Sequence, residues 1–147
     1  MIDHKDIPGW VDPPLPVNWD AYSHADMCEY ISAMHAVFAH QLTDEIKTWV
    51  LAAYLSTDYD WRKSNGCNVV DEGPFEGKFR HPMCVAHDFC CWKAARGLYS
   101  RRKGDKMFRK GNVGMGMSKI EALRRYIGVR GGAYLALIRG LLPRTGW

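Results

Sequence analysis

The segment from Cys84 to Cys90 places a histidine directly beside an aspartate in a stretch with helical character. Consecutive residues of a helix point about 100° apart, so His87 and Asp88 must face different partners. A histidine whose ring is oriented by a carboxylate acts as a general base near neutral pH. An aspartate can ligate a hard cation such as Ca²⁺ together with nearby carbonyl oxygens. The segment therefore offers a candidate general base at His87 and a candidate ligand for a hard cation at Asp88.

The carboxylate that orients His87 must come from another part of the chain. Asp105 is the best-placed candidate, because it lies on the next predicted helix and only a short turn separates the two helices. Antiparallel packing of these helices would bring positions 87 and 105 face to face. We therefore predict that His87 and Asp105 form the catalytic pair.

Cysteines around the same helix support a second interpretation. The chain has five cysteines, an odd number, so at least one thiol is left over from any internal disulfide pairing. Cys84, His87 and Cys91 share a face that can bind zinc, with Cys67 or His81 as a fourth ligand. Cysteines also pack in cores as small apolar residues, and the sequence leaves both interpretations open.

Two helices are predicted in the N-terminal part of the chain and one directly after residue 82. Asp26, with Glu29 three residues later, has the spacing of a helix start, and the acidic residues 44 and 45 after Thr43 favour a second start. Pro82 suits the first turn of a helix over about 83–98.

The remaining helical signals lie after residue 100. A helix is expected around 105–110, and glycines mark its end. Ser118 and Glu121 have the spacing of a capping box, so a further helix is predicted from there to about 129. The glycines at 131–132 are expected to break it before a short apolar helix over 133–142. The fold class predicted is mainly α.

Two stretches lack helical patterns. Residues 1–24 contain four of the seven prolines and are predicted to be an extended arm. After residue 56 turn residues dominate, and residues 69–70 form at most a short strand; such a long loop is usually functional or poorly ordered. The predicted organisation is an arm at 1–24 and one helical domain at 25–147, divided into helices at 25–56, a loop region at 57–82 and helices at 83–147.

The motif Cys-x-x-His-Asp-x-Cys, formed by Cys84, His87, Asp88 and Cys90, resembles the helix motif of the secreted phospholipase A2 superfamily. Asp105 is similar to the aspartate that holds the catalytic histidine in short bacterial and fungal members. The resemblance implies two antiparallel helices of phospholipase A2 type and covers roughly the C-terminal half of the chain.

A second resemblance concerns the same half. The segment 82–130 looks like an uncharacterised family of small phage and prophage proteins, which share a His-Asp helix and a last helix rich in Arg, Tyr and Gly. This likeness implies an origin in a phage.

The phospholipase resemblance implies hydrolysis of a phospholipid ester. His87 would deprotonate a water that attacks the carbonyl, Asp105 would hold the imidazole, and Asp88 would bind Ca²⁺, which stabilises the oxyanion. A calcium loop would add ligands, and Gly73 is the predicted contributor. The glycines and cysteine before His87 depart from the spacing of the family.

The amino-acid composition and net charge limit the kinds of molecule that the protein is expected to bind. Hydrophobic residues make up 47% and charged residues 24%, which is typical of a packed domain. The net charge of +4 permits an anionic partner without requiring one, and no specific nucleic-acid recognition is expected. No signal peptide or apolar run of about 20 residues is evident. We therefore expect synthesis in a host cytoplasm, with mostly free thiols.

Three functions remain open on the sequence alone. The first is calcium-dependent hydrolysis of phospholipid at a membrane surface. The second is a non-catalytic, virion-associated structural protein of a capsid, neck or tail, which reuses the scaffold and binds other virion proteins. The third is an interaction module stabilised by zinc.

Overall fold

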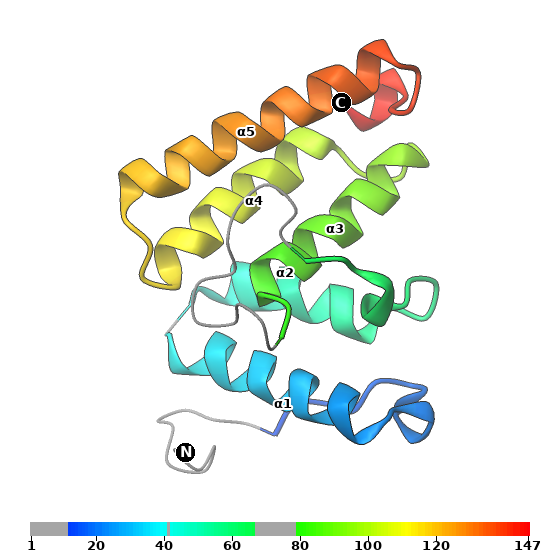
Figure 1. Ribbon diagram of the computed structural model, residues 1–147, viewed down its shortest axis with the longest axis vertical. Coiled ribbons are helices and arrows are strands. Elements are labelled where there is room, and N and C mark those ends of the chain that lie inside the picture. Colours follow the sequence, from blue (N-terminus) through cyan, green and yellow to red (C-terminus); the bar gives the residue numbers. More distant parts are fainter. Residues whose placement is uncertain (1–11, 41, 67–78) are drawn as a thin grey trace.

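The computed structural model describes residues 12–40, 42–66 and 79–147 of the chain. Within these ranges the protein is mainly α, as predicted, and contains no strand. The α-helices are α1 (His24–Ala39), α2 (Asp44–Leu55), α3 (Pro82–Ala95), α4 (Arg101–Gly114) and α5 (Lys119–Ile138). Short 3₁₀ turns occur at η2 (Trp19–Ala21), η3 (Trp61–Lys63) and η5 (Arg144–Gly146). Figure 1 shows α1 at one end of the molecule and α5 at the other, with α2, α3 and α4 between them.

Helices α3 and α4 form an antiparallel pair joined by a short turn. Two glycines of α4 allow their close approach, because a Cβ atom on Gly104 would collide with Cys90 and one on Gly111 would collide with Met83. Residues near the end of α3 therefore lie against the start of α4, and residues at the start of α3 lie against its end. This register brings the middle of α3 next to the first turns of α4.

The main core lies between α1, α2, α3 and α4. Its largest fully buried side chains are aromatic, and the ring of Tyr54 contacts those of Tyr30 and Trp61 at centroid distances of 5.9 and 5.0 Å. Burial of each large apolar side chain contributes roughly 1.5–3 kcal/mol, so Trp61 anchors the chain after α2 firmly to this core. A smaller cluster of Ala94, Ala133 and Leu142 attaches α5 and the C-terminal turn to α3.

The helix starts agree with the sequence signals except at α1 and α4. Thr43 and Ser118 cap α2 and α5 with their side chains, and Pro82 occupies the first turn of α3, as predicted. Helix α1 is capped by Ser23, whose hydroxyl accepts from the Asp26 N–H at 3.1 Å while the Asp26 carboxylate accepts from the Ser23 N–H at 3.0 Å. Asp26 is therefore the third helical residue, and the predicted start at Asp26 was wrong by one turn.

The predicted division of the C-terminal segment was also wrong. Helix α5 runs without interruption through Gly131 and Gly132 to Ile138. A glycine inside a helix costs about 1 kcal/mol relative to alanine, and the fully buried Ala133 that follows anchors the helix to the rest of the protein. Helix α4 likewise extends beyond the predicted 105–110 in both directions and includes Gly111.

The described part of the N-terminal arm packs on its own chain. Pro16 is buried, and the Pro14 carbonyl accepts a hydrogen bond from the Tyr30 hydroxyl at 2.6 Å. Trp19, which also belongs to the arm, is 48% exposed. The predicted short strand at 69–70 lies outside the described residues. Among those that are described, no helix is long and apolar enough to cross a membrane.

Candidate functional site

The structure brings His87 of α3 and Asp105 of α4 together in the interior. His87 Nε2 lies 2.6 Å from Asp105 Oδ1, and the two residues are 7% and 0% exposed. An ionised carboxylate only accepts hydrogen bonds, so Nε2 carries the proton and donates it. In the neutral imidazole the lone pair then lies on Nδ1. This is the arrangement that a general base requires.

Asp105 is held by arginines from two helices in addition to His87. Arg101 Nε of α4 donates to Oδ1 at 3.1 Å, and Arg130 Nη1 of α5 donates to Oδ2 at 2.9 Å. Burial alone would raise the pKa of Asp105, but the hydrogen bonds and positive charges of His87 and Arg101 outweigh it and lower the pKa. Asp105 is therefore an ionised carboxylate fixed from three sides.

Neither arginine was predicted from the sequence as part of the site. Arg101 precedes Asp105 by four residues, which places the two side chains on one helix face, so its role could have been foreseen. Arg130 lies in a region where the helix was expected to end. Because α5 continues as a helix past residue 130, the side chain of Arg130 lies within hydrogen-bond distance of Asp105.

The environment of His87 favours its protonated form. Burial would lower the pKa of His87, but the neighbouring Cys91 and the hydrogen bond and charge of Asp105 raise it to about 9. The ring also packs against Phe108, with centroids 4.7 Å apart. Cys91 Sγ is 3.8 Å from Nδ1, the nitrogen that Asp105 does not engage. At neutral pH the ring is therefore mainly the imidazolium, and the neutral base predominates only above about pH 9.

Asp88 faces a different part of the molecule, as adjacent helical residues must. Its Oδ2 accepts from the Ser64 hydroxyl at 2.5 Å, and the hydroxyl oxygen of Ser64 in turn accepts from the Gly66 N–H at 3.2 Å. Burial raises the pKa of Asp88, although the Ser64 hydroxyl, the charge of His87 and the nearby backbone N–H groups of Asn65 and Gly66 oppose the shift. Asp88 therefore ties the segment after η3 to α3.

The described residues do not build a calcium site by themselves. Of the predicted ligands only Asp88 is described, whereas Gly73 lies outside the described residues. No group of three His, Cys, Asp or Glu side chains that could hold a metal occurs in the described ranges. The Ser64 hydroxyl already engages one oxygen of the Asp88 carboxylate. We therefore derive no catalytic step through calcium.

The predicted zinc face lacks one of its ligands in this structure. Cys84 is disulfide-bonded, so its sulfur is not a thiolate that could bind zinc. Cys28, Cys90 and Cys91 are free, as expected for most of the thiols. Burial raises the pKa of Cys90 to about 12, and its sulfur accepts from Trp49 Nε1 at 3.0 Å.

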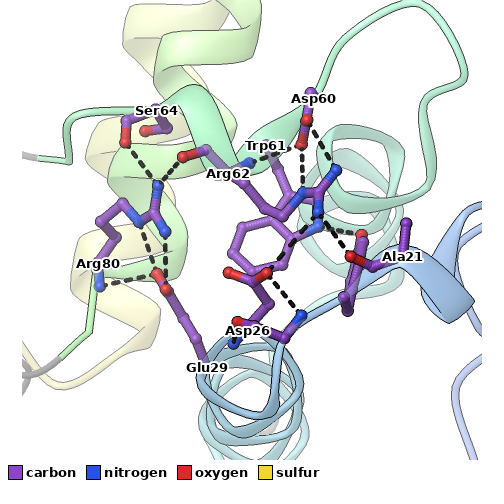
Figure 2. Close-up of polar contacts among 10 residues, drawn as sticks. Ala21, Asp26, Glu29, Asp60, Trp61, Arg62, Ser64 and Arg80 are labelled. Carbon is purple, nitrogen blue, oxygen red and sulfur yellow. Dashed lines mark hydrogen bonds and ion pairs between the residues drawn. The ribbon is translucent and has the colours of Figure 1, made fainter.

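A buried ion pair positions the segment that contacts Asp88. Arg80 donates to both oxygens of Glu29 on α1, at 2.7 and 2.8 Å, and also to the backbone carbonyls of Arg62 and of Ser64, the latter at 2.8 Å. Figure 2 shows the guanidinium of Arg80 between Glu29 and these carbonyls. Bidentate arginine–carboxylate pairs are geometrically specific, so Arg80 fixes Ser64 relative to α1. No spacing in the sequence indicates this pair.

One groove of the described residues lies away from the dyad. Its volume is about 760 Å³, and it is lined by side chains of α2, α4 and α5 that include Ile46, Lys106 and Tyr126, but neither His87 nor Asp88. No protein-family model, no curated protein and no solved structure matches this chain. Its function must therefore be argued from its own residues.

Proposed function

We propose that this protein is an ester hydrolase of phospholipase A2 type, in which His87 is the general base and Asp105 orients it. One observation carries the proposal, the 2.6 Å hydrogen bond between His87 Nε2 and the buried Asp105 carboxylate. In the neutral ring, which predominates only above about pH 9, this bond fixes the tautomer that has its lone pair on Nδ1. General-base catalysis by a positioned histidine typically contributes about 10²–10⁴-fold to a rate.

The proposed reaction follows from this tautomer. Nδ1 of His87 takes a proton from a water molecule as the water oxygen bonds to the ester carbonyl carbon. The imidazolium that forms is stabilised by the Asp105 carboxylate. When the tetrahedral intermediate collapses, the carbon–oxygen bond to the alcohol breaks, and the imidazolium returns the proton to the leaving oxygen. The products are a fatty acid and a lysophospholipid.

Arg101 and Arg130 serve this reaction by holding Asp105 rather than by contacting substrate. Their guanidinium groups keep the carboxylate ionised and prevent it from rotating away from His87. The choice of phospholipid as the substrate class is supported by the resemblance of the motif at 84–90 to the phospholipase A2 superfamily. A calcium requirement through Asp88 remains a prediction, and a chelator added to the assay tests it.

The test is release of fatty acid from phospholipid vesicles by the wild-type chain and by His87→Gln. We expect the variant to lose about 10²–10⁴-fold in rate, because glutamine cannot take up the proton. His24→Gln is the matched control, since His24 is exposed at the start of α1. Equal release by wild type and His87→Gln would refute the proposal.

A non-catalytic virion or assembly protein is the second candidate. It is favoured by the fact that Asp105 joins α3, α4 and α5 through His87 and the two arginines, which are contacts that a structural network would also make. Such a protein is expected in stoichiometric copies in purified particles and releases no fatty acid. Its absence from particles would contradict this candidate.

A further inference from the structure

Helix α5 carries its large apolar side chains on the solvent side. The residues that face the protein include Ala122 and Ala133, which are fully buried and small. The outward residues are 38–76% exposed: Ile120, Leu123, Ile127, Tyr134, Leu135 and Ile138. A helix that covers a core normally has the opposite distribution, and one that is apolar all round is normally buried.

These exposed residues form one continuous stripe, which we call the outer face of α5. Positions 120, 127 and 134 are seven apart, and 138 lies five helical turns from 120, so all lie on the same side. Gly131 lies on this side too, and a Cβ atom added there would meet nothing within 4 Å. Figure 1 shows α5 at the edge of the molecule, in contact with α4 on one side. A patch of this extent on a soluble domain marks an interaction surface.

The charge around the outer face identifies what it can bind. Residues 101–147 contain twelve Lys and Arg but two Asp and Glu, a net charge of +10, whereas residues 1–100 carry a net charge of −6 from eight basic and fourteen acidic residues. Of the two acidic residues, Asp105 is buried and Glu121 pairs with Arg124 and Arg125. The net charge of +4 for the whole chain is therefore the sum of a strongly basic C-terminal third and an acidic remainder.

The basic side chains lie close to the stripe. Lys119 and Arg124 are exposed on α5 itself, and Arg139 is exposed directly after its end. Further exposed cations line the neighbouring helix α4: Arg102, Lys103, Lys106, Arg109 and Lys110. Packed helices lie about 8–10 Å apart, which is about the Debye length at physiological salt, so both sets act on the same bound surface.

The apolar stripe and the surrounding positive charge together favour one kind of binding partner over the others. A second copy of the chain would bring two basic faces together, and a nucleic acid would leave the apolar stripe in water. A membrane with anionic lipids satisfies both features, because apolar side chains enter the acyl boundary while the cations meet the headgroups.

We propose that the outer face of α5 docks in the plane of a membrane that contains anionic phospholipid. The choice of a lipid surface, rather than an acidic protein, rests on the proposed function. The docking face lies on the opposite side of α5 from Ala122 and Ala133, which pack against the protein, and the His87–Asp105 pair is buried beneath the helix. Docking therefore does not require insertion of the dyad into the bilayer.

Co-sedimentation of the full chain with vesicles tests the docking face. The vesicles are made of ether-linked phosphatidylcholine, with or without ether-linked phosphatidylglycerol, and contain no ester to hydrolyse. We expect binding that requires the anionic lipid and weakens with added salt. Ile127→Ser should lower the vesicle affinity about tenfold, because it removes a large apolar side chain from the contact.

Ile31→Ser is the matched control, since Ile31 is 47% exposed on the distant helix α1. It should leave vesicle affinity unchanged. Absence of binding, or equal affinity of the wild type and Ile127→Ser, would overturn the proposal. A concentration-dependent dimer that Ile127→Ser abolishes, with no vesicle binding, would show that a second copy covers this face. Because ether lipids report binding alone, a failure of the hydrolysis proposal leaves this measurement intact.

Discussion

Two histidines of the same helix region differ in their neighbours but not in their burial. His81 caps the start of α3 and His87 lies in its middle, and both are 7% exposed. Burial and the positive charges of Arg125 and His40 lower the pKa of His81 to about 4. At His87 burial acts in the same direction, but Cys91 and Asp105 reverse its effect and raise the pKa to about 9.

The contrast shows that the partner, rather than burial, decides what a buried histidine can do. His81 stays neutral, and its Nδ1 accepts a hydrogen bond from the Met83 N–H at 3.2 Å, which is a structural role. His87 can take up a proton because the Asp105 carboxylate stabilises the resulting charge. The same residue type thus serves as a helix cap in one place and as a candidate base in another.

Asp105→Asn should produce the largest effect, since it removes the carboxylate that distinguishes the two sites. We expect fatty-acid release to fall about 10²–10⁴-fold, because an amide can donate to Nε2 and stabilise the wrong tautomer. The pKa of His87, measured by NMR titration of the histidine resonances, should fall from about 9. The activity assay and the titration together separate a catalytic effect from a structural one.

Glu29→Gln is the control for this variant, because Glu29 is also a buried carboxylate bound by an arginine and makes no contact with His87. It should change the pKa of His87 little and retain hydrolysis at a temperature where it is folded. If both variants reduced hydrolysis equally while the pKa of His87 stayed at about 9, Asp105 would be structural.

Local signals predicted most of the framework of the site. The helix starts at Thr43, Pro82 and Ser118 depend on residues within one turn of the chain, and the short turn after α3 makes antiparallel packing of 87 against 105 the natural outcome. These features need no knowledge of distant contacts. For that reason the sequence could indicate them.

The contacts that complete the site join distant segments. Arg130 reaches Asp105 across 25 residues, and Glu29 binds Arg80 across 51 residues. No periodicity encodes such pairs, and the glycines at 131–132 indicated a break in the helix that carries Arg130. Tertiary packing of Ala133 overrides that local preference, so the path of α5 could be learned only from the structure.

The stability of the protein in mild acid tests whether His81 stays neutral in the folded protein. The pKa of His81 is about 4 in the folded protein, against 6.5 for a histidine in an unfolded chain, so between these values the unfolded chain binds a proton that the folded chain excludes. The free energy of unfolding should therefore fall by up to about 3 kcal/mol as the pH drops from 6.5 to 4. Urea denaturation at a series of pH values measures it.

His81→Asn is the matched variant for this measurement, because asparagine caps helices well but does not titrate in this range. Subtracting its pH profile from that of the wild type isolates the contribution of His81 from those of the carboxylates. The difference should be largest above pH 6.5 and shrink towards pH 4. Parallel profiles would mean that His81 is not kept neutral by its surroundings.

Arg125→Gln gives the smallest expected effect and examines the cause of the low pKa of His81. Burial is the larger cause and the charge of Arg125 the next, so removal of that charge should raise the pKa of His81 by less than about one unit. Arg124→Gln is the control, since Arg124 also pairs with Glu121 but its side chain is 77% exposed. NMR titration of both variants measures the shift. An unchanged pKa in Arg125→Gln would leave burial as the main cause, whereas a rise in both variants would implicate Glu121, which loses an arginine partner in each.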